Sequence, residues 1–309
     1  MTRHAVSYVA AAAAGAALAG CHRAAATLTP QTSGVSTIAN VGFNQPENLV
    51  YDAASDVYLV SNMGPGQPAA RDDNGFISRV SPDGKVLALR WIAGGVNGAT
   101  LDAPKGLAIR GDTLAVADVG AVHYFDRRTG SPLGSETLPG LVMNDLAFAS
   151  DGSLWITDTG PDRGTTPIDT SKDMDAVWRI PRGGRVQAIA RGLGLDRPDG
   201  IVFDGTGALV ATFGSDKLER VGAGTSRNSW VTVTTLPGDS VDGLRRAPDG
   251  SLIATSWQAQ SVWKLGEGYA RTPLLTNVTS PAGVAIDTRR HRLAITSMKD
   301  NMLYLLPLH

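Results

Sequence analysis

PENLVYDAASDVYLVSN, at residues 46–62, holds two short apolar runs separated by a polar turn, which is the pattern of two antiparallel strands. The same strand, turn and strand recur five more times along the chain. The further copies begin at residues 104, 143, 198, 241 and 281. Repeated units place equivalent residues at equivalent positions around a common axis. A column of the aligned repeats therefore predicts a ring in space.

The repeats predict an all-β fold with four strands in each unit. A third strand-like run follows each hairpin, such as FISRV at 76–80, and an outer run follows in most units, such as KVLALRWI at 85–92. Six such units, with equivalent positions 39 to 58 residues apart, are typical of a six-bladed β-propeller. The run VSTIANV at 35–41 has no hairpin partner, and the last unit lacks an outer strand after MLYLLPL at 302–308. We therefore predict that the N-terminal run completes the last blade and closes the ring.

Composition excludes some classes of function. The chain has 309 residues, and the repeats cover nearly all of it after residue 45, so one domain is favoured. The net charge is −1 and the basic residues are scattered, which argues against a nucleic-acid partner. The 36 glycines suit many short strands joined by tight turns.

The first 21 residues have the form of an export signal. Arg3 precedes sixteen mostly small or apolar residues at 5–20, which are too few to span a bilayer comfortably. Leu-Ala-Gly-Cys at 18–21 resembles the lipobox of bacterial lipoproteins, which implies that Cys21 is acylated and becomes the first mature residue. The alternatives are an ordinary secretory signal and a loose transmembrane helix.

This interpretation divides the chain into a lipoprotein signal peptide at 1–20, a lipidated Cys21 with a flexible tether at 21–34, and the propeller at 35–309. Membrane contact is then expected only through the lipid. Residue 22 is histidine rather than the aspartate that the resemblance links to inner-membrane retention. In a bacterium with two membranes we therefore expect an anchor on the periplasmic side of the outer membrane.

One column of the repeats carries the candidate site. It holds the residue just before the first apolar pair of each unit, and its members are Glu47, Lys105, Asn144, Asp199, Asp242 and Ala282. Three carboxylates and an amide gathered near one axis repel each other and lose hydration, so they need a cation or must take up protons.

Calcium is the cation that suits this column best, because it accepts six to eight oxygens in a loose geometry. No histidine or cysteine occupies the column, so we prefer calcium to zinc, and also to magnesium, as the divalent cation. Lys105 leaves an alternative open. It stands in the same column and could neutralise a carboxylate in a metal-free network.

The layout resembles the family of senescence marker protein, gluconolactonase and luciferin-regenerating enzyme. The resemblance rests on the early Glu47, on Asn144 in the third unit and on Pro-Asp-Gly at 198–200, and it covers most of the chain after residue 40. The family implies a lactonase supported by calcium or zinc. It implies Glu47, Asp199 and Asp242 as metal ligands, Asp242 as the base and Asn144 as a substrate-binding residue. Lys105, which faces the same channel, is a second candidate for substrate binding.

The sequence departs from that family at several positions. Glu47 opens Glu-Asn-Leu-Val-Tyr instead of Glu-Gly-Pro-x-Trp, the blade-four ligand is Asp199 rather than asparagine, and Val142 replaces an arginine that grips sugar lactones. These departures argue against a sugar lactone as the substrate. We expect an exported, metal-dependent hydrolase of lactones or related esters. The alternative is a non-catalytic propeller that binds a ligand or a protein partner through the same face.

Two further groups of residues have a structural interpretation. A second column holds the residue at the end of the second strand of each repeat, and its members are Asn62, Asp118, Asp158, Phe213, Ser256 and Ser297. Its aspartates are expected to form turns, with Asp118 as an alternative ion-pair partner of Lys105. The tryptophans at strand positions are expected in the core between blades, and these are Trp155, Trp178, Trp257 and Trp263.

Overall fold

The structure, a computed structural model, describes residues 34–160, 175–205, 207–222, 230–236, 238 and 240–308. The predicted signal peptide, Cys21 and all of the predicted tether except Gly34 lie outside these residues. The described part consists almost entirely of strands, with two short 3-10 turns, η1 (Leu193–Leu195) and η2 (Glu267–Tyr269). Among the residues described, no helix is long and apolar enough to cross a membrane.

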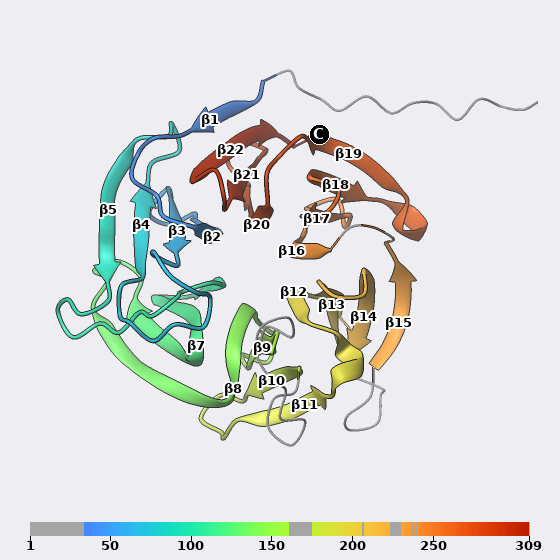
Figure 1. The fold of residues 1–309 in the computed structure, drawn as a ribbon, viewed down its shortest axis with the longest axis horizontal. Helices are drawn as coiled ribbons and strands as arrows, with labels where there is room; N and C mark the ends of the chain where they lie inside the picture. The colour runs from blue at the N-terminus through green and yellow to red at the C-terminus, as the bar shows by residue number, and fades with distance from the viewer. Residues whose placement is uncertain are drawn as a thin grey trace, which may run out of the picture.

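The strands form sheets arranged around a central axis, which is a β-propeller (Figure 1). In each four-stranded sheet the strands follow one another antiparallel from the axis outward. The first sheet contains β2 (Pro46–Asp52), β3 (Val57–Asn62), β4 (Phe76–Val80) and β5 (Val86–Ala93). The second contains β6 (Leu107–Arg110), β7 (Thr113–Asp126), β8 (Pro132–Phe148), β9 (Leu154–Asp158), β10 (Ala176–Ile180) and β11 (Gln187–Arg191).

The remaining three sheets have four strands each. The third contains β12 (Pro198–Phe203), β13 (Ala208–Thr212), β14 (Lys217–Val221) and β15 (Trp230–Thr235). The fourth contains β16 (Val241–Arg246), β17 (Leu252–Ser256), β18 (Ser261–Leu265) and β19 (Arg271–Thr276). The last contains β20 (Pro281–Asp287), β21 (Arg292–Ser297), β22 (Met302–Pro307) and β1 (Ser36–Ile38).

The prediction of six separate blades is wrong, because the described strands form five sheets and repeats two and three share the six-stranded one. β7 is continuous through the second and third strands of repeat two, with an irregularity at Gly120, whose φ is 65°. β8 pairs with β7 through Val142 and with β9 from Met143 onward. The outer strand of repeat two thus becomes the inner strand of repeat three without a loop. β8 thus carries two ladders in succession, one with β7 and one with β9, and joins both repeats in one sheet.

The predicted closure of the ring is confirmed. β1 pairs antiparallel with β22, with Ser36 opposite Leu305 and Ile38 opposite Leu303. Ile38 is buried in the apolar cluster that also contains Leu303 and Leu305. The first and last described strands therefore lie side by side in one sheet, as Figure 1 shows, and β22 has no free edge.

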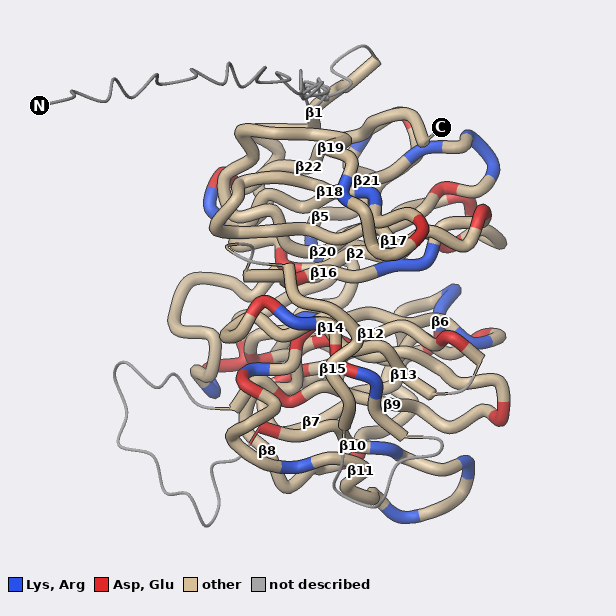
Figure 2. The backbone as a smooth tube through the Cα atoms, turned by 90° about the vertical axis from the view of Figure 1, so that its right-hand side faces the viewer, with Lys and Arg blue, Asp and Glu red and all other residues tan. Residues whose placement is uncertain are grey.

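Neighbouring sheets are held together by apolar side chains and by a few buried ion pairs. Leu49 and Tyr58 of the first sheet pack against Ala285 and Ala294 of the last. Arg127, after β7, donates to Asp52 of β2 at 2.7 Å and ties the second sheet to the first. Acidic and basic residues are spread over the whole molecule (Figure 2).

Candidate functional site

A β-bulge at the start of the inner strand positions most members of the ring column. Pairing between β2 and β3 is interrupted between Pro46 and Leu49, so Glu47 lies in the gap. The same interruption recurs between residues 143 and 146, 198 and 201, 241 and 244, and 281 and 284. A bulge releases residues from the ladder and turns their side chains out of the strand plane. The strands therefore free Glu47, Asn144, Asp199 and Asp242 for the channel.

Glycines next to the ring residues let adjacent inner strands approach closely. A Cβ atom added at Gly200 would lie 2.5 Å from the carbonyl oxygen of Asp242, and one at Gly243 would collide with the carbonyl of Ala282. No residue with a side chain fits such a contact without a shift of the backbone. The close approach brings the carboxylates of successive repeats into one cluster.

Threonines on the second strands fix the bulges in place. Thr157 Oγ1 accepts a hydrogen bond from the Asp145 N–H at 2.9 Å and donates to the Asp199 carbonyl at 2.6 Å. Thr296 in β21 likewise accepts from Gly283 and donates to the carbonyl of Glu47, both at 2.8 Å. Each hydroxyl thus links the bulge of its own repeat to the ring residue of the next. These threonines were not predicted as functional, although they form a column of their own, one residue before the end of the second strand of their repeats.

Replacing Thr296 with valine should lower the free energy of unfolding by about 1–3 kcal/mol, because the buried Gly283 N–H and Glu47 carbonyl then lack a partner. Urea denaturation measures the change. Thr272→Val, on the exposed part of β19, is the matched control and should change stability by less than about 0.5 kcal/mol. Equal effects of the two substitutions would contradict the role of the hydroxyl.

The ring residues are buried together at one end of the channel. The exposed fractions are 5% for Glu47, 3% for Lys105, 8% for Asn144, 3% for Asp199 and 6% for Asp242. Asn144 Nδ2 donates to Asp199 Oδ2 at 2.8 Å and to Thr159 Oγ1 at 2.9 Å. Glu47 Oε2 and Asn144 Oδ1 are buried and have no hydrogen-bond partner in the described part of the chain. These two oxygens are therefore available to a ligand.

Burial is the main cause of altered acidity in the ring. It raises the pKa of Glu47 and of Asp199 well above their usual values, and the nearby Asp242 carboxylate raises both further. Burial also raises the pKa of Asp242 to about 8, the Asp145 carboxylate adds to this rise, and the Trp257 indole offsets part of it. The raised pKa values favour the protonated form of the three acids, and a cation that balanced their charge would act in the opposite direction.

Lys105 does not neutralise the ring by direct contact. Its Nζ donates to the carbonyls of Pro68 at 2.8 Å and Ala103 at 2.9 Å, and no described carboxylate oxygen forms an ion pair with it. Burial lowers the pKa of Lys105, while the charges of Glu47 and Asp118 act against that change. The lysine thus influences the acids through space, and the metal-free network of direct Lys–carboxylate pairs is absent from the residues described.

An ion pair between the partly buried Arg245 and the buried Asp145, which directly follows the ring residue Asn144, forms a floor below the ring. Arg245 Nη1 donates to Asp145 Oδ2 at 2.7 Å, and Nη2 donates to Asp145 Oδ1 at 3.2 Å and to Asn48 Oδ1 at 3.3 Å. Below it Arg245 borders a cavity of about 310 Å³ lined mainly by apolar side chains. The floor therefore separates the ring from the other end of the channel. Arg245 was not predicted as part of the site, although a charged residue inside an inner strand is visible in the sequence.

The second column holds loops together, which supports its interpretation as turn-forming. Asp118 accepts hydrogen bonds from the N–H groups of Asp102 and Ala103 and lies 3.4 Å from His123. Asp158 accepts from the Trp178 indole, and burial raises its pKa to about 6. Neither Asp118 nor Asp158 forms an ion pair with Lys105, whose Nζ donates to two backbone carbonyls instead.

The alignment of that column needs one correction. Thr212 lies opposite Pro198, just as Asn62 lies opposite Pro46, so Thr212 rather than Phe213 belongs to the column.

The burial of the four tryptophans differs from the prediction at one position. Trp155 and Trp178 are buried in the core as predicted, and Trp263 is packed against it, but Trp257 follows the end of β17 and is only half-buried.

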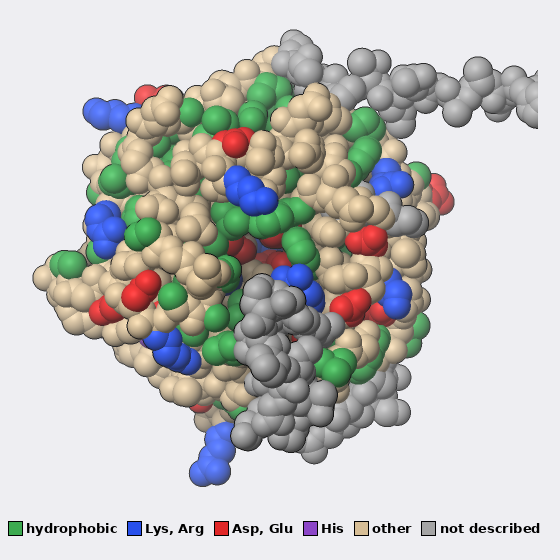
Figure 3. Space-filling view, in the orientation of Figure 1, with side chains coloured by type: hydrophobic (Ala, Val, Ile, Leu, Met, Phe, Trp, Pro, Cys, Tyr) green, Lys and Arg blue, Asp and Glu red, His purple; other side chains and the backbone are tan. Residues whose placement is uncertain are grey.

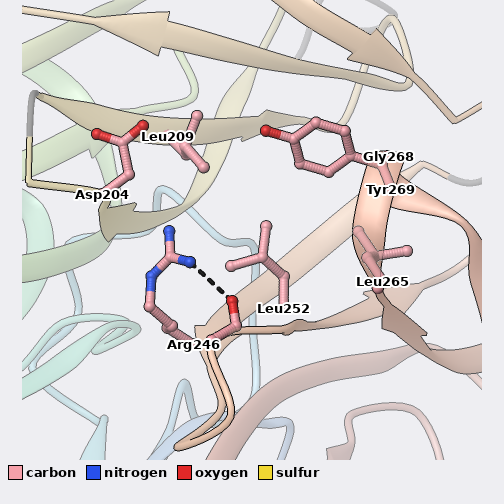
Figure 4. Close-up of a pocket in the computed structure, with 9 residues that line it drawn as sticks. Asp204, Leu209, Arg246, Leu252, Leu265, Gly268 and Tyr269 are labelled. Atoms are coloured by element: carbon pink, nitrogen blue, oxygen red, sulfur yellow. Dashed lines mark hydrogen bonds between the residues drawn. The ribbon is translucent and has the colours of Figure 1, made fainter.

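A separate pocket of about 300 Å³ lies at the opposite ends of β12 and β16 (Figure 4). Arg246 Nη1 donates there to the Gly250 carbonyl at 2.9 Å, and Asp204 pairs with Arg220 at 2.7 Å. Its charged groups are thus engaged in the protein itself. The ring residues Asp199 and Asp242 stand at the starts of the same strands, so this pocket is distinct from the ring.

Comparison with solved structures identifies the architecture. A gluconolactonase from Xanthomonas campestris superposes with a TM-score of 0.66 at 21% identity, covering 89% of both chains. A putative gluconolactonase gives 0.65 at 19% identity, covering 90% of this chain and 93% of the other. The calcium-binding protein regucalcin from Agrobacterium tumefaciens gives 0.64 at 16% identity, with coverages of 89% and 94%. The chain has the gluconolactonase-like propeller fold. At these identities the likeness shows the fold, and neither a family model nor a curated protein matches the sequence.

The ring of this gluconolactonase-like fold offers donor atoms for a metal ion. The described residues contain no group of three or more acidic, histidine or cysteine side chains already placed to hold a metal ion. The donor set nevertheless fits a hard cation, since it consists of oxygens only and two of them, on Glu47 and Asn144, lack a partner.

Proposed function

We propose that this chain is a divalent-metal-dependent hydrolase of lactones or related esters. The observation that carries the proposal is the cluster of three buried acids, Glu47, Asp199 and Asp242, whose pKa values are all raised. Such a cluster is costly to the fold, and buried acids with altered pKa values are found more often at functional sites than elsewhere. The likeness to gluconolactonase structures supports the reaction class, and the likeness to the calcium-binding protein regucalcin supports calcium.

The residues divide into roles that the geometry supports. The cation would be held by Glu47, Asp199 and Asp242. When bound, it would polarise the ester carbonyl and lower the pKa of a bound water molecule. Asp242 accepts the proton of the water that attacks the carbonyl carbon. The ester C–O bond then breaks, and the leaving oxygen takes up that proton. Asn144 Oδ1, which has no partner among the described residues, accepts a hydrogen bond from the substrate or the water, and Lys105 orients the substrate through its charge.

Metal content and hydrolysis test this proposal together. We expect the purified protein to carry close to one divalent ion per chain, to lose lactone hydrolysis on treatment with a chelator, and to recover it best with calcium. Zinc and magnesium are the comparison ions. Full hydrolysis by protein shown to be metal-free would contradict the role of the cation. No hydrolysis of any lactone or ester by the metal-loaded protein would leave the non-catalytic binding propeller as the better explanation.

The metal-free protein should lose stability as the pH rises from about 5 to about 8. The folded pKa values of Glu47, Asp199 and Asp242 are raised, so the folded state binds more protons than the unfolded state throughout this window, and unfolding becomes easier as they are lost. Calcium should therefore raise the melting temperature more at pH 8 than at pH 5. Asp158 contributes in the same direction, so Asp242→Asn is the control and should flatten the slope. A melting temperature independent of pH and calcium would oppose this prediction.

We also propose that the chain is exported and anchored by a lipid on Cys21, on the periplasmic side of the outer membrane. The lipobox-like residues 18–21 and the apolar run at 5–20 support this proposal. Cys21→Ala should move the protein from the membrane fraction to the soluble fraction and abolish incorporation of labelled fatty acid. A wild-type protein that takes up no label would oppose the lipid anchor.

A further inference from the structure

Six equivalent residues form a collar above the ring. Five of them donate the backbone N–H to the carbonyl of the residue two positions before the ring residue. Trp257 donates in this way to Ser240 at 3.2 Å, and Met298 donates to Ser280 at 3.1 Å. The same bond joins Met63 to Gln45 and Phe213 to Arg197. The equivalent residue follows the strand-end aspartate in repeats two and three. The collar consists of Met63, Val119, Thr159, Phe213, Trp257 and Met298.

The collar is apolar in all but one position, and its side chains contact each other in two groups. Met63 and Val119 belong to one apolar cluster, against which Met298 packs. Phe213 and Trp257 form an edge-to-face pair with ring centroids 5.4 Å apart. Trp257 also lies against the Asp242 carboxylate and offsets part of its pKa rise. The aromatic pair is therefore adjacent to the acid that we propose as the base.

Part of the collar remains open to solvent. Phe213, Trp257 and Met298 are half-buried, whereas the core residues of the same sheets are buried completely. Figure 3 shows hydrophobic side chains around a central hollow and acidic atoms within it. Arg197 lies 4.8 Å from the ring centroid of Phe213, and Lys299 lies 5.3 Å from that of Trp257. The charge of Arg197 also lowers the pKa of Asp199 and Asp242, against the larger effect of burial. The exposed parts of Phe213, Trp257 and Met298 are available to a ligand.

The collar offers few hydrogen bonds to a ligand. Thr159 carries the one hydroxyl among its six side chains, and that group already donates to Pro198 at 3.0 Å and accepts from Asn144. The Trp257 indole N–H is the one collar side-chain donor without a hydrogen-bond partner among the described residues. A polyhydroxylated ring would lose water from several hydroxyl groups here and gain at most this one partner, which is unfavourable. An apolar substituent would instead bury its own surface together with that of Trp257 and Phe213, which is favourable.

We propose that this site takes lactones or esters that carry an apolar substituent, and that Trp257, Phe213 and Met298 select them. The proposal rests on the function proposed above and adds a substrate class to it. Val142 of β8 agrees with it, because this residue is apolar and its backbone carbonyl accepts the N–H of the collar residue Thr159 at 3.0 Å.

Three δ-lactones with the same ring test the selectivity: δ-dodecalactone with an alkyl chain, unsubstituted δ-valerolactone and polyhydroxylated glucono-δ-lactone. We expect kcat/KM to be highest for δ-dodecalactone and lowest for glucono-δ-lactone. In Trp257→Ala and Phe213→Ala the ratio of kcat/KM for δ-dodecalactone to that for δ-valerolactone should fall at least about tenfold, mainly through KM. Met298→Asn is a milder variant should either aromatic substitution prevent folding. Leu133→Ala, at an exposed apolar residue on the outer part of β8, is the control and should keep the wild-type ratio.

Binding of the non-hydrolysed δ-dodecalactam, measured by calorimetry, separates this inference from the proposed reaction. Lactam binding that Trp257→Ala weakens at least about tenfold, without hydrolysis of any lactone, would support the apolar collar and overturn the hydrolase. Hydrolysis with equal or greater kcat/KM for glucono-δ-lactone would support the hydrolase and overturn the collar. Lactam binding that is unaffected by Trp257→Ala and by Met298→Asn would likewise overturn the collar.

Discussion

Replacing Asp242 with asparagine should lower kcat for lactone hydrolysis by about 10²–10⁴-fold, because the variant has no carboxylate to take the proton from the attacking water. Asparagine keeps the size of the side chain and can still approach the Trp257 indole, so the fold should survive. Removal of an acid whose pKa is raised to about 8 also relieves the repulsion within the ring, so stability at pH 8 should not fall. Steady-state kinetics on the metal-loaded protein, with metal content measured in parallel, gives the result.

The matched control for Asp242→Asn is Asp249→Asn, in the turn after β16 of the same sheet. The side chain of Asp249 is 54% exposed and pairs with Lys264 far from the ring, so kcat should stay within about twofold of the wild type. If Asp242→Asn keeps wild-type kcat while retaining its metal, Asp242 is not the base. If it loses the metal as well, adding excess calcium distinguishes a ligand from a base, because only the loss of a ligand can be compensated by mass action.

Replacing Arg245 with methionine should destabilise the protein by about 3–5 kcal/mol, because it leaves a buried carboxylate without its partner. The side chain of Asp145 is 2% exposed, and its charge lies close enough to Glu47 and Asp242 to raise the pKa of both. The free energy of unfolding in urea measures the loss. Methionine keeps most of the length of arginine, so a change of packing contributes little.

Two further variants show whether the charge of Asp145 causes that loss. Asp145→Asn combined with Arg245→Met should recover part of the stability, since no unpaired charge then remains. Arg179→Met removes the exposed Arg179–Asp151 pair on β10 and should cost less than about 1 kcal/mol. An Arg245→Met effect as small as that of Arg179→Met would show that the floor does not stabilise the fold.

Strand positions and the ring column could be predicted from the sequence because both depend on local patterns. Alternating apolar residues and tight turns specify each hairpin, and the third strand predicted at 76–80 is β4. Repetition then fixes the position of each residue around the axis, and so Glu47, Asn144, Asp199 and Asp242 are buried together. The pairing of the N-terminal run with β22 followed from the missing outer strand of the last repeat.

Contacts between distant repeats could not be predicted, because a column of aligned residues gives neither the depth of a side chain nor its partner. Arg245 bonds to Asp145 and Asn48, which precede it by 100 and 197 residues, and Lys105 donates to the carbonyl of Pro68 instead of to a carboxylate. The fusion of repeats two and three into one sheet depends on how β8 continues past Gly140. The repeats thus specify which residues surround the channel, whereas the tertiary structure decides which are paired, which oxygens remain unpaired and how apolar the mouth above them is, since these depend on hydrogen bonds and packing between sheets.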